Sequence, residues 1–431
     1  MEKGLASKCG PSRRSVKAAC ASSTSPSSIR PESIAGAFRA AEHAEAWVER
    51  GAEVTVFTGW PNYPTGSVFA GYDVRMLAEE TVSGVRVLRS KLVARPNTNV
   101  FRRVVNGMSF LVYGAANILF NGKRIGEGFD VVLASSGTVF AGYLGLLYAK
   151  TRRLPLVVEF RDITYEQMVA TGTSRWSWKV RLMRRLELHL AKASARVVVL
   201  TKGFKELLCD EGVDGGLVSV VPNGADAEER VRDENPSELV LGYYGTMGIS
   251  QNVPETLEYA AAIERLGIPV RYFIVGEGAA RSDVEGALAA GRYPFARLMR
   301  GMPKQELEAY YRKTDLSIVS LQRSDSFKAT LPSKVLQSFA RGIPVLFIGP
   351  EGEAARLVRE SGAGIALTGG RGEDLSSLEG FFSDPGCRDE LKAMGGRALK
   401  TVEGRFMRKD LASRMLETLK DAADERGQEN D

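Results

Sequence analysis

Residues 238–260 read ELVLGYYGTMGISQNVPETLEYA, and this stretch joins an apolar strand to a helix through a glycine turn. The apolar run ends at Gly245, residues 246–248 form the turn, and the helical pattern begins near Val253. A strand, a glycine turn and a helix in this order are typical of a parallel βαβ unit. The helix N-terminus that follows such a strand is where doubly wound folds hold phosphate groups.

Short β-branched and aromatic runs alternate with helical patterns along the chain. The first series comprises 53–58, 85–90, 130–135, 155–160 and 196–201, and the second comprises 238–245, 269–276, 296–301, 315–320 and 343–349. Nearly continuous apolar strands between helices predict parallel sheets that are covered on both faces. Two such series in 431 residues predict an α/β protein with two Rossmann-like, doubly wound domains facing each other across a cleft.

Polarity and charge indicate the expected domain boundaries. A basic, Ser-rich arm is expected over 1–30, a first domain over 31–226, a linker over 227–237, a second domain over 238–405, and a C-terminal helix with a charged tail over 406–431. The linker stretch is polar, charged and contains a proline, which suits an exposed connection. The C-terminal helix is amphipathic, so we expect it to pack back on the first domain.

The formal net charge of +6 and the pI near 9.0 are a mild basic excess. This excess suits an anionic substrate or an anionic membrane surface, whereas nucleic acid would need a denser basic stripe. No apolar run is long enough to span a bilayer, and the first 30 residues lack the apolar core of a secretory signal. A transit-like tail, a disordered arm and a mis-assigned start stay open for that segment. Four scattered cysteines without a CxxC pair favour a cytoplasmic protein.

The stretch LPSKVLQSFARGIPVL, residues 331–346, has an unusual helix start. We expect Ser333 to cap the helix, Lys334 to lie in its first turn, and Gln337 to face inward. A lysine there opposes the helix dipole, and a bound anion would reverse the sign of that effect. The alternative is a lysine whose ammonium group reaches solvent.

A second glycine turn follows the strand at 269–276, with Gly276 and Gly278 before a helical pattern. Each glycine turn alone suits an ordinary βα connection as well as it suits a phosphate site. Glycine also lets backbone N–H groups approach a phosphate. Two such turns in one domain, followed by Lys334, favour a nucleotide diphosphate.

The first half offers charged candidates at two predicted element ends. Gly36 and Arg39 lie at a helix start, where a loop could face the phosphate of a ligand, or where Arg39 could simply be solvated. Glu159 and Arg161 end a strand, which suits either a site at the cleft mouth or a structural ion pair. His43 lies in a helical pattern and is expected to be a packing or surface residue.

Two basic-aromatic stretches, 99–114 and 174–190, combine Arg and Lys with Phe or Trp. Such a composition suits an amphipathic helix at the surface of an anionic membrane. The alternative is a helix that faces the core and has a solvated basic side.

Several motifs together resemble the retaining glycosyltransferases of family 4. They are YYGTMGISQ (243–251), FIVGEGAA (273–280), RGMPKQELEAYYRKTDLSIVSL (300–321), LPSKVLQSFARGIPVL (331–346), EGEAARLVRESGAGI (351–365) and VVPNGAD (220–226). Within that family, GWPNYPTG (59–66) and EFRDITYEQMVATG (159–172) are similar to transferases of bacterial surface-polysaccharide assembly, including fucosamine transferases. The resemblance implies a GT-B fold with an acceptor-binding first domain and a second domain that binds a UDP- or GDP-linked sugar. It also implies retention at the anomeric carbon, without a metal or another cofactor.

The resemblance assigns roles to individual residues. The donor-binding set comprises Gly36, Arg39, Gly245, Thr246, Gly248, Gly276, Glu277, Arg300, Ser333, Lys334, Gln337 and Glu353. Lys334, Glu353 and Arg161 are the catalytic candidates. The chain departs from the family where relatives carry two glutamates, at Ala329 and Gln337, and where they carry a histidine, at Ser135 and Ser136.

The expected reaction transfers a hexosyl group or an N-acetylated aminosugar to a lipid-linked or polysaccharide acceptor, in O-antigen or capsule assembly. The enzyme would be cytoplasmic, with peripheral association to the inner face of the membrane. Two alternatives stay open: a catalytically silent partner that binds the nucleotide sugar, and a nucleotide-sugar 2-epimerase. The family's first strand corresponds to residues 15–28, whose composition predicts a weak strand at best.

Overall fold

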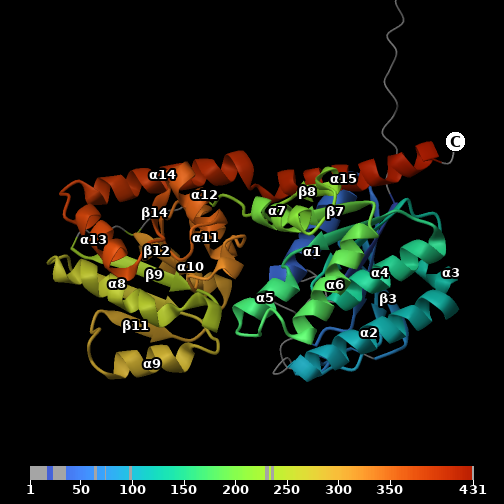
Figure 1. Cartoon of the computed structure of the whole chain (residues 1–431), viewed down its shortest axis with the longest axis horizontal. Helices are drawn as coiled ribbons and strands as arrows, with labels where there is room; N and C mark the ends of the chain where they lie inside the picture. The colour runs from blue at the N-terminus through green and yellow to red at the C-terminus, as the bar shows by residue number, and fades with distance from the viewer. Residues whose placement is uncertain are drawn as a thin grey trace, which may run out of the picture. The chain divides into compact units, whose positions relative to one another are not determined.

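The structure is a computed structural model that describes residues 17–22, 35–62, 66–72, 74–96, 100–228, 233 and 237–429. These residues divide into two compact units (Figure 1). The first unit comprises those within Met1–Arg161, Leu190–Val197 and Ala412–Asp431, and the second comprises those within Asp162–His189 and Val198–Leu411.

An eight-stranded sheet has the order β3-β4-β2-β1-β5-β6-β7-β8. Its strands are β1 Lys17–Ser22, β2 Glu53–Gly59, β3 Leu77–Val82, β4 Val85–Ser90, β5 Val131–Ser136, β6 Leu156–Phe160, β7 Arg196–Val199 and β8 Val218–Val220. β1 pairs in parallel with β2 and with β5, whereas the edge strand β3 is antiparallel to β4. The strand order therefore reverses between β1 and β5, which is a topological switch point.

The N-terminal boundary predicted at residue 30 needs correction, because β1 lies near the middle of this sheet. Ala18 pairs with Val54 on one side and with Val131 on the other, and its side chain is fully buried. Small side chains at a central position leave little signal in the sequence, yet both neighbouring strands supply hydrogen bonds. The other parts of the predicted arm, 1–16 and 23–30, lie outside the described residues.

The second sheet has six strands in the order β11-β10-β9-β12-β13-β14, and all of its pairs are parallel. Its strands are β9 Leu239–Tyr244, β10 Val270–Val275, β11 Ala296–Met299, β12 Leu316–Ser320, β13 Val345–Ile348 and β14 Gly364–Leu367. Counted from β9 this is the order 3-2-1-4-5-6 of a dinucleotide-binding fold, and its switch point lies between β9 and β12. Each of the ten runs predicted as strands overlaps a strand of one of the two sheets.

Helices connect the strands of both sheets. In the first half they are α1 Ala35–Glu49, α2 Val100–Phe120, α3 Gly122–Ile125, α4 Val139–Arg152, α5 Thr164–Ala170, α6 Trp178–Lys192 and α7 Lys202–Asp210. In the second half they are α8 Val253–Arg265, α9 Arg281–Ala289, α10 Lys304–Lys313, α11 Ser333–Phe339, α12 Glu353–Ser361, α13 Arg371–Phe382, α14 Cys387–Arg405 and α15 Arg408–Glu429. Three 3₁₀ turns are described as well: η1 Gly215–Leu217, η2 Ile249–Gln251 and η3 Asp325–Phe327.

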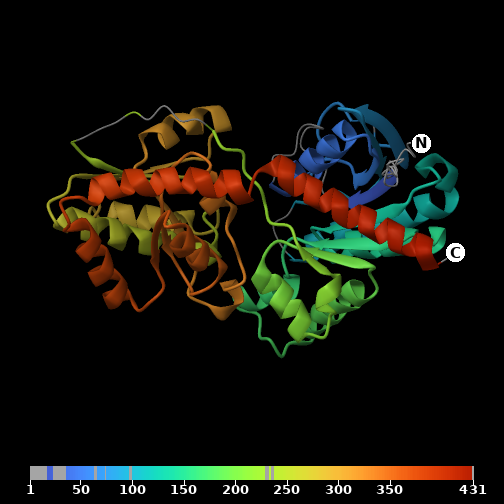
Figure 2. The same ribbon diagram turned by 90° about the horizontal axis from the view of Figure 1, so that it is seen from above.

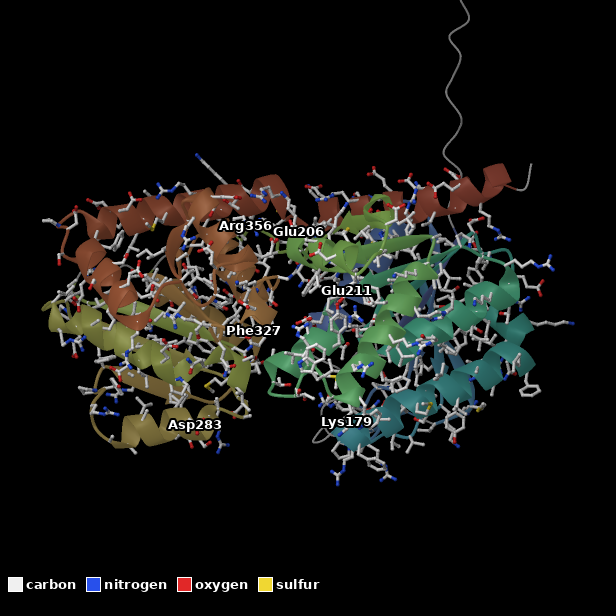
Figure 3. All side chains as sticks on the ribbon, in the orientation of Figure 1. Lys179, Glu206, Glu211, Asp283, Phe327 and Arg356 are labelled. Carbon is white, nitrogen blue, oxygen red and sulfur yellow. The ribbon has the colours of Figure 1, made fainter. Side chains whose placement is uncertain are left out.

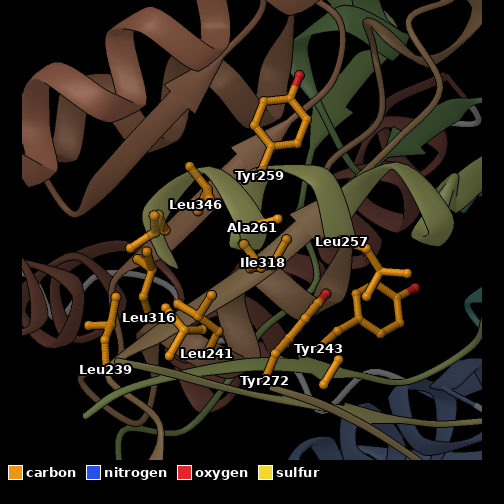
Figure 4. Close-up of a cluster of buried hydrophobic side chains, with 14 of the residues drawn as sticks. Leu239, Leu241, Tyr243, Leu257, Tyr259, Ala261, Tyr272, Leu316, Ile318 and Leu346 are labelled. Atoms are coloured by element: carbon orange, nitrogen blue, oxygen red, sulfur yellow. The ribbon is translucent and has the colours of Figure 1, made fainter. Parts of the chain in front are cut away.

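The core of the second unit lies between the six-stranded sheet and its helices (Figure 4). Leu241, Tyr272 and Ile318 come from three adjacent strands, and Leu257 comes from α8 above them. All four side chains are fully buried. This packing holds the carboxyl ends of β9 and β12 in place, where the candidate site lies.

The C-terminal helix α15 belongs to the first unit from Ala412 onward. The indole N–H of Trp47, on α1, donates to the carbonyl of Ala412 at 2.8 Å, and Arg196 of β7 pairs with Glu425. Figure 2 shows α15 alongside these elements. The helix therefore packs on the unit that contains the first half of the chain.

The compact units do not follow the boundary predicted at 227–237. Residues 198–226 cluster with the second unit, because the start of α7 bonds to segments far along the chain. Thr201 Oγ1 donates to the carbonyl of Ala329 at 2.7 Å, and the backbone N–H of Gly203 donates to Glu353 at 2.8 Å. Parts of the predicted linker, 229–232 and 234–236, lie outside the described residues.

Candidate functional site

The switch point of the six-stranded sheet brings two loops together. Ser320, at the end of β12, donates a hydrogen bond from its hydroxyl to the carbonyl of Gln251 at 2.5 Å. The backbone N–H of Gln322 donates to the carbonyl of Ser250 at 2.8 Å. These bonds join the loop after β9 to the loop after β12 at the carboxyl edge, where open α/β sheets bind ligands.

The two glycine turns pack directly on each other. A Cβ on Gly276 would lie 1.9 Å from the carbonyl oxygen of Gly245, and a Cβ on Gly278 would lie 2.2 Å from that of Met247. Gly276 and Gly278 also have φ angles of 157° and 153°, which L-residues rarely adopt. The two turns are therefore in direct contact, and the hypothesis that they form one phosphate site stays a prediction.

Lys334 lies beside the first glycine turn. A Cβ on Gly245 would come within 2.7 Å of Lys334 Cε, and the ammonium nitrogen lies 5.4 Å from the centroid of the Tyr243 ring. The described residues give this half-buried ammonium a ring contact but no hydrogen bond or ion pair. Burial lowers the pKa of Lys334 to about 8. An uncompensated cation at the sheet's switch point is suited to an anionic ligand.

Two details predicted for α11 are wrong. The helix begins at Ser333, and Pro332 occupies the N-cap position without a side-chain hydrogen bond, so Ser333 is not the cap. The side chain of Gln337 is exposed rather than turned inward. Lys334 is nevertheless in the first turn, as the sequence predicts.

The backbone N–H groups of the first turn are already bonded within the chain. The N–H of Gly245 donates to the carbonyl of Val275 at 2.9 Å, and that of Gly248 donates to Gln251 Oε1 at 2.9 Å. The expectation that these two groups face a phosphate is therefore wrong for this conformation. The hydrogen bond of Gly245 joins two backbone groups, so no side-chain rotation would release it. The hydrogen bond of Gly248 ends on the Gln251 side chain, and rotation of that side chain would free the N–H of Gly248.

Three other predicted donor-binding residues lie exposed around the two turns: Thr246, Glu277 and Arg300. The carbonyl of Thr246 accepts a hydrogen bond from the Tyr243 hydroxyl at 2.6 Å. Glu277 lies 3.8 Å from Arg281, and its backbone carbonyl accepts from the N–H of Met247 at 2.9 Å. The carboxylate of Glu277 is therefore near the glycine turns and accessible to a ligand.

Glu353 is the first residue of α12, and its carboxylate is engaged. It accepts the N–H of Gly203 at 2.8 Å and lies 3.7 Å from Arg356, which Figure 3 labels. A Cβ on Gly203 would lie 2.9 Å from the Cβ of Ala329, where relatives are expected to carry a glutamate. Ala329 is therefore packed against the start of α7, at a point with little room for a longer side chain.

The first unit contains a buried charged cluster at its own switch point. Arg39 Nε, on α1, donates to Glu159 Oε1 at 2.7 Å, and Ser135 Oγ donates to Glu159 Oε2 at 2.7 Å. Burial alone would raise the pKa of Glu159, but Arg39 and its other neighbours lower it to about 2. For Glu159 the structural ion pair is the observed alternative, but its partner is Arg39 rather than a charged neighbour on its own strand end. Arg39 is buried, so it is neither solvated nor directed at a phosphate.

His43 packs next to this cluster, with its ring centroid 5.6 Å from that of Trp47. Burial, aided by the charge of Arg39, lowers the pKa of His43 to about 3. It is therefore neutral at physiological pH, and it is a packing residue as expected. Gly36 lies in the first turn of α1, and the preceding loop, 31–34, lies outside the described residues.

Arg161, the third catalytic candidate, directly follows β6 and is half-buried. Its charge helps to lower the pKa of Glu159. Ser136, one of the two serines where relatives carry a histidine, is buried, and its hydroxyl has no hydrogen-bond partner among the described residues.

Sequence reasoning missed the side chains that support the second unit's site. Tyr243 lies under the Lys334 ammonium, and Gln251 caps Gly248. Arg323 follows β12 and bonds to Glu255 at 2.6 Å and to Asp374 at 2.5 Å, which ties α8 to α13. The only sequence signal was the adjacent tyrosine pair at 243–244, whose members must point to opposite faces of the strand.

The described part of the chain contains no group of three or more His, Cys, Asp or Glu side chains placed to hold a metal ion. Within the same residues, every helix is too short or too polar to cross a membrane.

Solved structures with the same architecture cover almost the whole chain. A sucrose-phosphate synthase from Thermosynechococcus elongatus has a TM-score of 0.69 at 15% identity, over 94% of this chain and 98% of that one. The chain has the GT-B fold. HepE from Anabaena, solved with UDP and glucose, and WaaG, a glycosyltransferase of lipopolysaccharide biosynthesis, each have a TM-score of 0.64 at 13% identity, over 94% of this chain and 99% of theirs.

Residues 36–224 match the model of the glycosyl transferase 4-like domain. A search of curated protein sequences finds no match. Together, the domain match and the GT-B fold support a glycosyltransferase. The match covers the half that contains the Arg39–Glu159 pair, whereas Lys334 and the glycine turns lie beyond it.

Proposed function

We propose that the chain transfers a sugar from a nucleoside diphosphate donor, with the diphosphate at the carboxyl edge of the six-stranded sheet. The observation that carries this proposal is the ammonium of Lys334 beside Gly245, which has no hydrogen bond or ion pair to any described residue. A diphosphate there would pair with a cation whose pKa burial lowers. The HepE structures with UDP and with UDP-glucose support a UDP-linked donor for this fold, and a GDP-linked donor is the other candidate.

The remaining residues take roles around that diphosphate. Glu277 and Arg300 are exposed near the second turn and are placed in the proposal at the base or ribose. Gln337 offers an amide to a ribose hydroxyl, since an amide both donates and accepts. Glu353 is placed near the donor sugar, where the Gly203 N–H holds its carboxylate.

The proposed chemistry is retaining and proceeds without a metal. The acceptor oxygen forms a bond to the anomeric carbon while the bond from that carbon to the diphosphate breaks on the same face. The departing diphosphate oxygen takes the acceptor proton, and Lys334 offsets the negative charge that develops on the leaving group. Arg161 is the candidate from the first half of the chain that would position the acceptor.

The proposed substrate pair is an N-acetylated aminosugar donor and a lipid-linked saccharide of a surface polysaccharide, such as O-antigen or capsule. The printed role of WaaG in lipopolysaccharide biosynthesis supports this class of acceptor. An acceptor held in lipid would place the enzyme at the inner face of the cytoplasmic membrane.

A panel of UDP- and GDP-sugars, read by release of the nucleoside diphosphate, tests the proposal. At least one donor should release UDP or GDP slowly in water and faster with a saccharide acceptor, and Lys334→Met should reduce that rate at least tenfold. Tight nucleotide binding without release from any donor would favour the silent partner instead. Conversion of the donor into its C2 epimer, with the diphosphate bond intact, would favour the 2-epimerase.

A further inference from the structure

The helix α2 exposes apolar side chains along its whole length. Phe101 is 75% exposed near its start and Phe120 is 84% exposed at its end. Between them lie Val104, Met108, Val112 and Leu119, which are exposed as well. Steps of three, four and seven residues bring Phe101, Val104, Met108, Val112 and Leu119 onto one side of a helix. We call these five residues and Phe120 the apolar stripe of α2.

The opposite side of α2 holds the helix in the first unit. Phe110 and Asn117 are buried there, and a Cβ on Gly107 or Gly114 would clash with Phe140 or Leu144 of α4. Figure 1 shows α2 on the outside of this unit. Because the other side makes these contacts, the stripe is not needed for the packing of α2. A surface helix usually has polar residues on its outer side, so the stripe suits an apolar partner.

The charged residues of the segment that carries the stripe are all of one sign. The segment from Lys91 to Gly126 contains no aspartate or glutamate, whereas its cations are Lys91, Arg95, Arg102, Arg103, Lys123 and Arg124. Arg102 and Arg103 lie at the start of α2, and Lys123 and Arg124 lie just beyond its end. The partner should therefore be negatively charged at both ends of an apolar surface.

A second copy of this chain does not fit that requirement. Cations stand at both ends of the stripe, so a symmetric dimer through α2 would place like charges opposite each other in either orientation of the two helices. An anionic lipid surface supplies acyl chains for the stripe and headgroups for the arginines and lysines at once.

We propose that α2 docks the protein on an anionic membrane by lying in the plane of its surface. The 21 residues of α2 give a helix about 31 Å long, and the stripe enters the boundary between headgroups and acyl chains along that length. This proposal rests on the proposed function only for the lipid-linked acceptor that docking would bring within reach. Docking itself is a property of the first unit and does not depend on the donor site.

Sedimentation with vesicles tests the docking directly. The full chain should sediment with vesicles of phosphatidylcholine and phosphatidylglycerol at low salt, less at high salt, and not with phosphatidylcholine alone. Arg102→Glu with Arg103→Glu should weaken binding about thirtyfold or more, and Val112→Glu about tenfold. Both variants should keep the thermal midpoint of the wild type, because the altered side chains are exposed.

Matched controls change the same properties elsewhere. Lys313→Glu with Lys400→Glu makes the same change in net charge at exposed positions of α10 and α14, and Leu266→Glu adds a carboxylate at an exposed leucine. These controls should bind vesicles within about threefold of the wild type. Equal losses in the controls, or no sedimentation of the wild type at low salt, would overturn the proposal.

Two further measurements separate the alternatives. A dimer in light scattering that Val112→Glu converts to a monomer would overturn membrane docking in favour of a second copy. UDP binding, measured by titration, should be the same for the α2 variants as for the wild type. Vesicle binding without binding of either UDP or GDP would contradict the proposed function alone. Binding of UDP or GDP without vesicle binding would contradict the docking alone.

Discussion

The ammonium nitrogen of Lys334 lies 5.4 Å from the centroid of the Tyr243 ring, at the switch point of a parallel sheet of order 3-2-1-4-5-6. The ring stabilises the cation but provides no counter-charge. The same ammonium group lies against the Gly245 turn. An anion that binds at this turn would therefore complete an electrostatic pair that the described residues leave open.

The affinity for UDP should depend on pH through Lys334. Its pKa is lowered to about 8 in the free protein, and a bound diphosphate should raise that pKa, so binding takes up a proton above pH 8. The UDP affinity relative to uridine should fall by only about twofold from pH 7 to 8, and above pH 8 it should fall by up to about tenfold per pH unit. Titration calorimetry across this range measures it.

Lys334→Arg is the control for that pH dependence. An arginine keeps its charge at every pH tested, so the relative affinity should become flat above pH 8. The same fall with pH in the arginine variant would show that another group titrates.

Gly276→Ala should disturb the site through the backbone. The new Cβ would lie 1.9 Å from the Gly245 carbonyl oxygen, at a φ of 157°, so we expect a loss of about 2–4 kcal/mol in the free energy of unfolding. UDP binding should weaken as well, since Gly245 has to move. Urea unfolding and UDP titration measure the two effects.

Gly286→Ala is the matched control. This glycine lies inside α9, where a Cβ would meet nothing within 4 Å, so alanine should stabilise the chain by about 0.5–1 kcal/mol. Equal effects of the two substitutions would contradict the packing of one glycine turn on the other.

The Arg39–Glu159 pair should make the chain sensitive to acid. Glu159 has a pKa of about 2 in the folded chain, so its contribution is present above the unfolded pKa near 4.3 and is lost as the pH falls toward 2. His43 has a pKa of about 3 in the folded chain, whereas a histidine in the unfolded chain takes up a proton near pH 6.5. The contribution of His43 to the free energy of unfolding therefore decreases as the pH falls below about 6.5. Glu187, whose pKa burial raises to about 7, opposes this trend between pH 7 and about 4.5. The urea midpoint of the wild type should therefore decrease steadily only below about pH 4.5.

Two variants assign this slope to its residues. Compared with the wild type, His43→Gln should make the change in urea midpoint from about pH 6.5 to about pH 5 more favourable, because no imidazole titrates at this position in either state. Arg39→Met should cost about 3–5 kcal/mol at pH 7, since it leaves the Glu159 carboxylate buried and unpaired. An unchanged slope in His43→Gln would contradict the role of that residue.

The first strand should be essential to the eight-stranded sheet. Ala18 is fully buried between β2 and β5, so Ala18→Asp should cost about 3 kcal/mol or more in the free energy of unfolding. Lys17→Ala removes the partly exposed pair with Glu53 and the contact of the ammonium with the Phe129 ring, and it should cost about 1 kcal/mol. Thermal unfolding of both variants distinguishes a central strand from a dispensable arm.

Physical properties of four strands explain why the sequence analysis did not predict them. β3, β8 and β14 are edge strands, where pairing on one side allows short and partly exposed sequences. β1 is central but built from Ala, Cys and Ser, whose strand propensity is low, so its neighbours decide its conformation. The predicted strands were apolar and β-branched over several residues, and local pattern was sufficient there.

The site was only partly predictable for a similar reason. Lys334 could be found because a lysine in the first helical turn opposes a local preference. The pairing of Arg39 with Glu159 joins residues 120 positions apart, and no local pattern reports such a contact. The Gly248 donor was assigned to a phosphate because its cap, the Gln251 side chain, is a conformational choice that the sequence does not reveal.

Titration of UDP and of uridine into the wild type and Lys334→Met tests the central claim most directly. If the diphosphate lies on Lys334, the variant should bind UDP at least tenfold more weakly while its affinity for uridine stays within about twofold. Equal losses for UDP and uridine, or an unchanged affinity for UDP, would contradict the placement of the diphosphate at this lysine.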